Sequence, residues 1–214
     1  MGEGLFIGGA RGVLGPSGDF GDGPRVGQLV AVGIGAALVE SAGWPILAIG
    51  VAGLIAAVAY TAGPKPLGYL GLGDPLVFLF FGPAAVCGTI YVLQGELSVG
   101  AWVAALPMGC LSTAILVVNN LRDREEDARS GKRTLAVRLG ADGTRLEYLA
   151  LVASAYAIPV FGVMRLGLGA GWLLTLVTLP VALFRVRRLR MVDGDALNGE
   201  LAATAGLLAA YGTC

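Results

Sequence analysis

Two aspartates spaced four residues apart, Asp123 and Asp127, are the side chains best suited to chemistry in this sequence. Residues i and i+4 share one face of a helix, so both carboxylates would point the same way if this segment is helical. Mg²⁺ binds through one or two carboxylates and bridges to substrate phosphates, so the pair predicts a magnesium site. Asn119 and Asn120 lie one turn earlier and could supply amide oxygens. The same charges could instead form ion pairs along a solvated helix end, so the spacing alone leaves both interpretations open.

Basic residues follow the aspartates. Lys132 and Arg133 are cations of the kind that bind phosphate oxygens. The chain has no histidine, which excludes Ser–His catalysis and most zinc and haem sites. Cys87 and Cys110 fall in apolar segments and Cys214 is the last residue, so no disulfide framework or CxxC metal site is indicated. The chemistry that remains uses carboxylates, lysine, arginine, tyrosine or a hard metal ion.

The elements that must position these residues are apolar. Of the 214 residues, 56% are hydrophobic and 14% are charged, with a mean hydropathy of +0.76, whereas soluble domains are about 45–50% apolar and about 25% charged. This excess indicates that lipid is the solvent for most of the surface. The net charge of zero gives no reason to expect nucleic acid as a partner.

Apolar runs about as long as a bilayer-spanning helix divide the chain into seven segments. We therefore predict an all-α, polytopic transmembrane helical bundle. The expected spans are 27–43, 45–60, 75–94, 99–119, 145–165, 170–187 and 198–214.

The distribution of lysine and arginine predicts which side the connections face. Seven of these residues lie in 120–145 and four more in 185–190. By the positive-inside rule, both segments are cytoplasmic. Because successive spans cross the membrane in opposite directions, three long connections are then expected as cytoplasmic loops: 61–74, 120–144 and 188–197. We expect a multi-pass protein of the plasma or inner membrane whose site faces the cytoplasm.

Two separate motifs resemble one family. Residues 119–127, followed by 131–140, are similar to the second aspartate motif of the UbiA-type prenyltransferase superfamily. Residues 60–69, with 71–74, resemble a loop between two core helices in the members that prenylate 1,4-dihydroxy-2-naphthoate. The likeness covers roughly 25–205 of the chain.

The resemblance implies a mechanism that needs no histidine. Carboxylate-held Mg²⁺ would neutralise the diphosphate of a polyprenyl donor, so that the C–O bond ionises and an aromatic ring attacks the allylic cation. For this chain it implies transfer to 1,4-dihydroxy-2-naphthoate with loss of the acceptor's carboxylate, giving demethylmenaquinone. The apolar spans and the lipid bilayer would hold the isoprenoid tail.

The resemblance also implies a role for each candidate residue. Asp123 and Asp127 would hold the metal, assisted by Asn119 or Asn120. Lys65 would steady the diphosphate and Tyr60 would face the reacting carbon or the donor, so both are catalytic candidates beside the aspartates. The remaining side chains expected to contact the diphosphate or the aromatic substrate are Asn119, Asn120, Arg122, Lys132, Arg133 and Tyr69.

The amino-terminal segment departs from the family pattern. Members carry a first aspartate motif, Asn-Asp-Tyr-x-Asp-Gly, with a further Asp beyond it. Here Asp19 and Asp22 match it as candidate metal ligands, but Gly18 and Phe20 replace the asparagine and the tyrosine.

The expected organisation is therefore an amino-terminal loop, 1–26, with a reduced first motif, and a transmembrane prenyltransferase domain, 27–214. The family fold has nine helices, so seven spans imply that the first two are absent. Two alternatives remain open: prenyl transfer to another aromatic acceptor, such as a hydroxybenzoate or homogentisate, or a truncated, non-catalytic protein that binds lipid or quinone.

Overall fold

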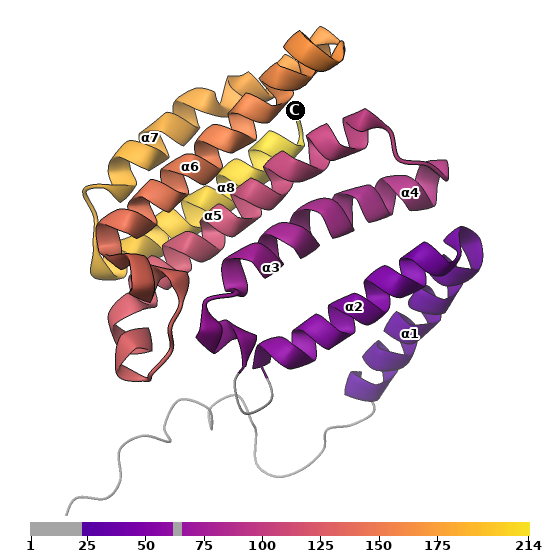
Figure 1. Ribbon diagram of the computed structural model, residues 1–214, viewed down its shortest axis with the longest axis horizontal. Coiled ribbons are helices and arrows are strands. Elements are labelled where there is room, and N and C mark those ends of the chain that lie inside the picture. Colours follow the sequence, from indigo (N-terminus) through magenta and orange to yellow (C-terminus); the bar gives the residue numbers. More distant parts are fainter. Residues whose placement is uncertain (1–22, 62–65) are drawn as a thin grey trace, which may run out of the picture.

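The computed structural model of the chain describes residues 23–61 and 66–214, and the side chains of 29–60 and 66–214 (Figure 1). Three candidate site residues, Asp19, Asp22 and Lys65, lie outside these ranges, so their roles stay predictions. The described residues form helices joined by short connections, and no β-strand occurs among them. The expected all-α class is therefore confirmed for this part of the chain.

The described residues form seven helical rods, each corresponding to one predicted span. The first three rods are α1 (Gly23–Ala42), α2 (Trp44–Thr61) and the continuous run of α3 (Gly73–Leu79), the π-helix η2 (Phe80–Cys87) and α4 (Gly88–Gln94). The others are α5 (Val99–Arg129), α6 (Leu135–Leu166), the run of η3 (Ala170–Thr178) and α7 (Leu179–Leu189), and α8 (Leu197–Gly212). Two short 3₁₀ helices, η1 (Leu67–Leu70) and η4 (Gly194–Ala196), precede α3 and α8.

Six of the seven rods described are apolar helices, and four of these also have the length of a membrane span. Within the described ranges, four are long and apolar enough to cross a bilayer: Gly73–Gln94, Val99–Arg129, Leu135–Leu166 and Ala170–Leu189. Leu29–Ala42 and Trp44–Tyr60 are shorter apolar helices. Large apolar side chains face outward, such as Leu54, 71% exposed, and Val177, 72% exposed. Such a surface is suited to lipid, so a polytopic helical membrane bundle is confirmed.

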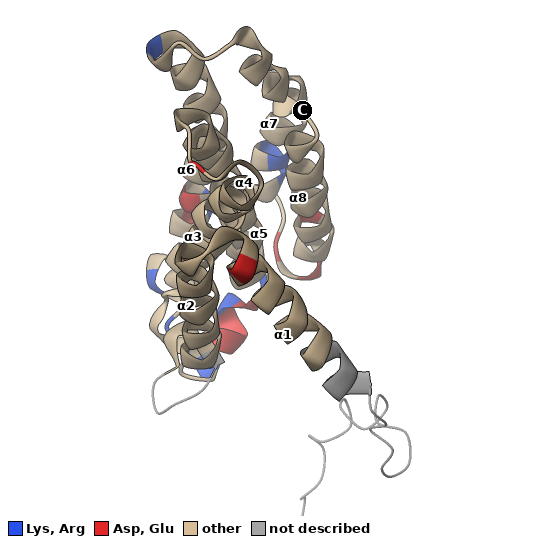
Figure 2. Cartoon of the chain, turned by 90° about the vertical axis from the view of Figure 1, so that its right-hand side faces the viewer, with Lys and Arg blue, Asp and Glu red and all other residues tan. Residues whose placement is uncertain are grey.

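Helix α5 packs at the centre of the main hydrophobic core. Its residues Leu111, Ala114, Val117 and Val118 are 0% exposed and pack with side chains of α6, α7 and α8. Neighbouring rods run in opposite directions, so the connections after α2, α5 and α7 lie at one end of the bundle (Figure 1). This agrees with the predicted alternation, whereas the assignment of that end to the cytoplasm stays a prediction. Figure 2 shows the rods as mostly tan, with few charged residues along them.

The connection expected over 120–144 is mostly helical. Helix α5 continues unbroken to Arg129, so its 31 residues span about 46 Å, well beyond a hydrocarbon core of about 30 Å. The residues that follow the apolar run are mainly leucine, arginine, glutamate and alanine, which are strong helix formers. The helix therefore outlasts the membrane, and residues 120–129 form a helical extension beyond it.

A short turn separates this extension from α6. Gly131 adopts a left-handed conformation, with φ +78°, and Thr134 caps α6 by accepting a hydrogen bond from the N–H of Val137 at 3.4 Å. Helix α6 therefore begins at Leu135, ten residues before the predicted span, and has one non-helical residue, Gly140. Only 130–134 of the predicted loop lacks helical structure.

The third rod approaches α5 at two glycines. A Cβ at Gly82 would lie 2.7 Å from the Cα of Gly109, and a Cβ at Gly109 would lie 2.8 Å from the carbonyl oxygen of Phe78. Side chains cannot be accommodated at such distances, so the two backbones meet directly. The contact involves the π-helical segment η2, which also contains Pro83.

We expect Gly82→Ala and Gly109→Ala each to destabilise the bundle by about 1–3 kcal/mol, because the added methyl group must push two backbones apart. Thermal unfolding in detergent measures this loss. Gly88→Ala is the matched control on the same rod, since a Cβ there would lie 3.7 Å from the Ile49 side chain, an ordinary contact. Equal melting temperatures for the Gly82→Ala and Gly88→Ala variants would contradict the close contact.

Candidate active site

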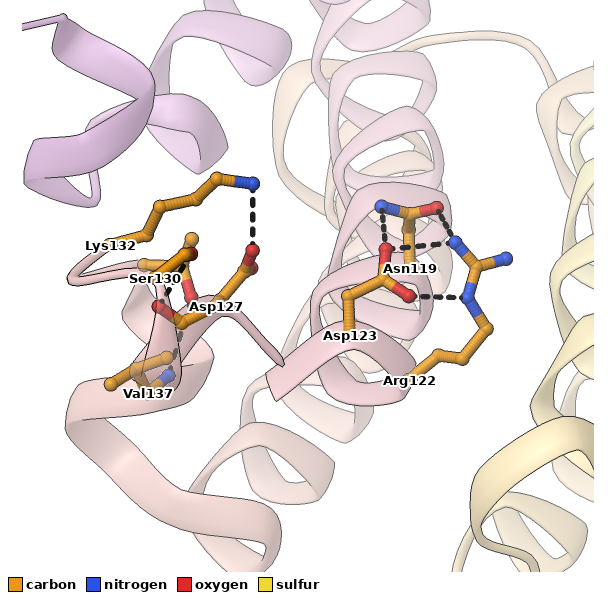
Figure 3. A network of polar contacts seen from close by, with 8 residues as sticks. Asn119, Arg122, Asp123, Asp127, Ser130, Lys132 and Val137 are labelled. Atoms are coloured by element: carbon orange, nitrogen blue, oxygen red, sulfur yellow. Dashed lines mark hydrogen bonds and ion pairs between the residues drawn. The ribbon is translucent and has the colours of Figure 1, made fainter. Parts of the chain in front are cut away.

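Three polar side chains form a row on the part of α5 that extends beyond its apolar run. Asn119, Asp123 and Asp127 are spaced by four residues in a continuous helix, so they share one face, as the sequence predicts (Figure 3). Asp127 is 6% exposed, whereas the side chain of Asp123 is 34% exposed. We call these three residues the acidic row.

A guanidinium covers Asp123. Arg122 donates from Nε to Oδ1 of Asp123 at 2.6 Å and from Nη2 to Oδ2 at 2.8 Å. Its Nη2 also donates to Oδ1 of Asn119 at 2.9 Å, and Nδ2 of Asn119 donates to Oδ2 of Asp123 at 3.3 Å. Its Nη1 donates to Oδ1 of Asn198, in α8, at 2.7 Å. Arg122, expected to contact substrate, is here paired with a carboxylate and with a second helix.

An ammonium group covers Asp127. Nζ of Lys132 donates to Oδ1 of Asp127 at 2.8 Å and lies 5.6 Å from the centre of the Tyr69 ring, within the range of a cation–π contact. The N–H of Lys132 also donates to the carbonyl oxygen of Asp127 at 2.9 Å, which closes the turn after α5. Each aspartate of the acidic row thus has its own basic partner (Figure 3).

The charges of Arg122 and Lys132 influence how this site titrates. The hydrogen bond from Arg122 lowers the pKa of Asp123 below its ordinary value, against the opposing effect of burial, and the charges of Arg122 and Lys132 lower it further. The hydrogen bond to Asp127 raises the pKa of Lys132. The lysine therefore acts on both carboxylates, bonding one and shifting the titration of the other.

The connection between α2 and α3 forms a wall beside the acidic row. The N–H of Arg133 donates to the carbonyl oxygen of Tyr69 at 2.9 Å, and Nη2 of Arg138 donates to that of Leu70 at 2.7 Å. Gly71 has φ +73°, and a Cβ there would lie 2.7 Å from the carbonyl oxygen of Arg133, so only glycine fits this contact. These contacts hold the Tyr69 ring beside the row.

Tyr60 packs on the same connection from the end of α2. A Cβ at Gly68 would lie 3.1 Å from Cζ of the Tyr60 ring, and a Cβ at Gly73 would lie 3.4 Å from its hydroxyl oxygen. The ring is 36% exposed. The other two candidates are less engaged: the Asn120 side chain is half-buried and has no hydrogen bond to the described residues, and the Arg133 side chain is exposed.

The acidic row presents oxygen donors of the kind that Mg²⁺ takes. It offers two carboxylates and one amide oxygen on one helix face. Among the described residues, no group of three or more His, Cys, Asp or Glu side chains could hold a metal ion. Mg²⁺ commonly uses one or two carboxylates and completes its shell with water and phosphate oxygens. The donors are therefore suited to a magnesium–diphosphate ligand rather than to a metal held by protein alone.

Two residues that organise this end of the bundle could not be identified from the sequence. Asn198 holds Arg122, as described above. Arg145, counted only as a topological charge, donates from Nε to the carbonyl oxygen of Leu189 at 3.1 Å and from Nη2 to Oδ1 of Asp193 at 2.6 Å. Asn198 lies 76 positions from Arg122, and Leu189 lies 44 positions from Arg145. No local spacing could therefore indicate these contacts.

One cavity borders the acidic row, and a second lies toward the opposite end of α5. A polar cavity of about 810 Å³ is lined by both ends of the Arg122–Asn198 contact and by Asp123, Arg124 and Arg145. An apolar cavity of about 700 Å³ lies between η2, α5, η3 and α8. Both volumes lie in the range of small-molecule sites, about 300–1,000 Å³.

Comparison with known proteins supports the motif assignments. The UbiA prenyltransferase family model matches residues 26–204. The chain is 45% identical over 107 residues to a 1,4-dihydroxy-2-naphthoate octaprenyltransferase of Haemophilus influenzae, covering 50% of this chain and 35% of that protein. Proteins of the same name from Mycobacterium tuberculosis and Escherichia coli are 44% and 37% identical over 144 and 160 residues. Those two alignments cover 67% and 74% of this chain, but 48% and 52% of the relatives.

The chain thus spans about half the length of the curated relatives it matches, or less. The matched region contains the acidic row and the wall that carries Tyr69.

The lowered pKa of Asp123 predicts how stability depends on pH. A carboxylate with a depressed folded pKa adds stability above its unfolded pKa of about 3.9, and this contribution disappears as the pH falls through the folded value. We expect Arg122→Gln to lower the melting temperature in detergent at pH 7, because Asp123 loses its main partner. The difference from the wild type should shrink below about pH 4. A difference that stays constant from pH 7 to pH 3 would contradict the pairing.

Proposed function

This chain belongs to the UbiA prenyltransferase family, and we propose that it transfers a polyprenyl group from a polyprenyl diphosphate to 1,4-dihydroxy-2-naphthoate, giving demethylmenaquinone in its reduced quinol form with release of CO2 and diphosphate. The observation that carries the proposal is the acidic row, in which two carboxylates on one helix face each have a cation within hydrogen-bond distance. The names of three relatives suggest the acceptor.

In this proposal Asp123, Asp127 and Asn119 hold Mg²⁺, with Asn120 assisting. Bound there, the ion offsets the charge of the diphosphate leaving group and eases cleavage of its C–O bond. Lys132 donates to Asp127 at 2.8 Å, so its ammonium group lies at the row, where it would bind a phosphate oxygen of the donor.

Three further cations complete the diphosphate site. Arg122 presents a planar fork that matches two phosphate oxygens. Arg133 is exposed beside the turn and reaches the same group. Lys65, in the connection before η1, adds a third positive charge.

Two tyrosines near the acidic row would contact the reacting carbon and the aromatic acceptor. Tyr60 faces the reacting carbon, where the negative face of its ring stabilises the developing allylic cation. Tyr69, fixed beside Lys132, borders the acceptor. The apolar cavity of about 700 Å³ takes part of the isoprenoid tail.

The remaining assignments concern the amino-terminal segment and the orientation of the chain in the membrane. Asp19 and Asp22, in the amino-terminal segment 1–26, are further metal ligands in this proposal, and 27–214 forms the transmembrane domain. From the positive-inside rule we propose that the amino-terminal segment and the connections after α2, α5 and α7 lie at the cytoplasmic face of the plasma or inner membrane.

The test supplies the whole chain, in lipid bilayers, with Mg²⁺ and a labelled polyprenyl diphosphate. Parallel reactions offer 1,4-dihydroxy-2-naphthoate, a hydroxybenzoate and homogentisate. Product from the naphthoate alone supports the proposal, and product from another acceptor replaces the naphthoate by that compound. Because the chain spans about half of its relatives, a second candidate is a binding protein without activity. Donor binding without product from any acceptor would establish that alternative.

If the chain is active, Asp123→Asn and Asp127→Asn should each lower the rate by about 100-fold or more, because each removes a charge that holds the metal against the leaving group. The exposed neighbour Glu126 gives the matched control, Glu126→Gln, which should keep nearly full activity. Initial rates at saturating donor and Mg²⁺ measure the effect. An Asp123→Asn, Asp127→Asn double variant with wild-type rates would refute the metal assignment.

A further inference from the structure

The Arg122–Asp123 contact has an unusual geometry for a helix. Consecutive residues point about 100° apart, so neighbours in sequence do not normally face each other. Here the arginine bends back and holds both carboxylate oxygens, at 2.6 and 2.8 Å. This conformation needs support from elsewhere, and the support comes from α8, where Oδ1 of Asn198 accepts from Nη1 at 2.7 Å.

The contact leaves little room for a metal at Asp123. Its Oδ2 accepts from Nη2 of Arg122 and from Nδ2 of Asn119, so both lone pairs of that oxygen are in use. Its Oδ1 accepts from Nε of Arg122 and keeps one lone pair. A divalent cation binding there would meet the positive guanidinium at close range. Metal and guanidinium therefore compete for one carboxylate.

Asn198 is held firmly enough to serve as an anchor. Two residues later, Glu200 is 3% exposed and pairs with two arginines of α7: Nε of Arg188 at 2.7 Å and Nη1 of Arg185 at 3.5 Å. These ion pairs fix the first turn of α8 against α7. Asn198 itself is exposed, so its side chain can change without disturbing a packed core.

A cavity beside Arg122 gives its side chain space to move. The polar cavity of about 810 Å³ is lined by Arg122, Asp123 and Asn198. A diphosphate that enters this space offers the guanidinium oxygens with the same forked geometry as a carboxylate. The arginine could then exchange one anion for another at small electrostatic cost.

We propose that, while metal is absent, Arg122 occupies the carboxylate of Asp123 and blocks metal binding there. Asn198 is the positioning residue that holds Arg122 in this conformation, and the donor diphosphate releases the arginine by binding its guanidinium. The inference rests on the proposed function, since it assumes that the acidic row binds metal. It implies that metal binds weakly to the chain alone and more tightly together with the diphosphate, which accepts the displaced arginine.

The test is a titration of the full chain in bilayers with Mn²⁺, followed by electron paramagnetic resonance, without any diphosphate. Asn198→Ala should bind Mn²⁺ about five- to tenfold more tightly than the wild type, because the competing guanidinium loses its anchor. Arg122→Gln should bind at least as tightly as Asn198→Ala. Adding Asn198→Ala to Arg122→Gln should bring no further change, because the asparagine acts through the arginine.

Met191→Ala is the matched control, since Met191 is an 82% exposed residue of the connection that precedes α8 and should leave Mn²⁺ affinity unchanged. A merely structural role for Asn198 would lower metal affinity, which is the opposite sign. Unchanged or weaker binding by Asn198→Ala, or additive effects in the double variant, would overturn the inference and leave the proposed function standing. No Mn²⁺ binding by the wild type or by Arg122→Gln, even with a polyprenyl diphosphate present, would overturn both.

Discussion

Two carboxylates on one helix face at the edge of a bilayer repel each other, and the surrounding elements supply the charges that offset this repulsion. Arg122 comes from the same helix and Lys132 from the turn after it. Each basic residue is in turn fixed by another element: Arg122 by Asn198 of α8, and Lys132 by its approach to the Tyr69 ring. The site is therefore held by contacts between segments that are far apart in the sequence.

The sequence was informative wherever a local pattern reports a physical quantity directly. The length of an apolar run must match the thickness of the hydrocarbon, so all seven rods could be located within the described residues. The four-residue spacing of Asp123 and Asp127 determines that both share a face once the segment is helical. Local spacing thus predicted the acidic row correctly.

Other features could not be read from local patterns. Hydropathy indicates where lipid ends and not where a helix ends, so the end of α5 at Arg129 could not be located from the apolar run. Asn198 and Arg145 contact residues dozens of positions away, and nothing in their immediate surroundings distinguishes them from solvated polar residues. The pairing of Arg122 with its own neighbour was equally hidden, because adjacent helical residues are expected to diverge.

The meeting of Gly82 and Gly109 has a consequence for how this scaffold can diversify. Where two backbones touch, no side chain lies between them, and any larger residue at either glycine would collide with main-chain atoms. The third rod and α5 are consequently locked in one register, with neither sliding nor rotation available to adjust the space between them. Sequence variation is therefore accommodated more easily in the polar connections at the end of the bundle than at this contact.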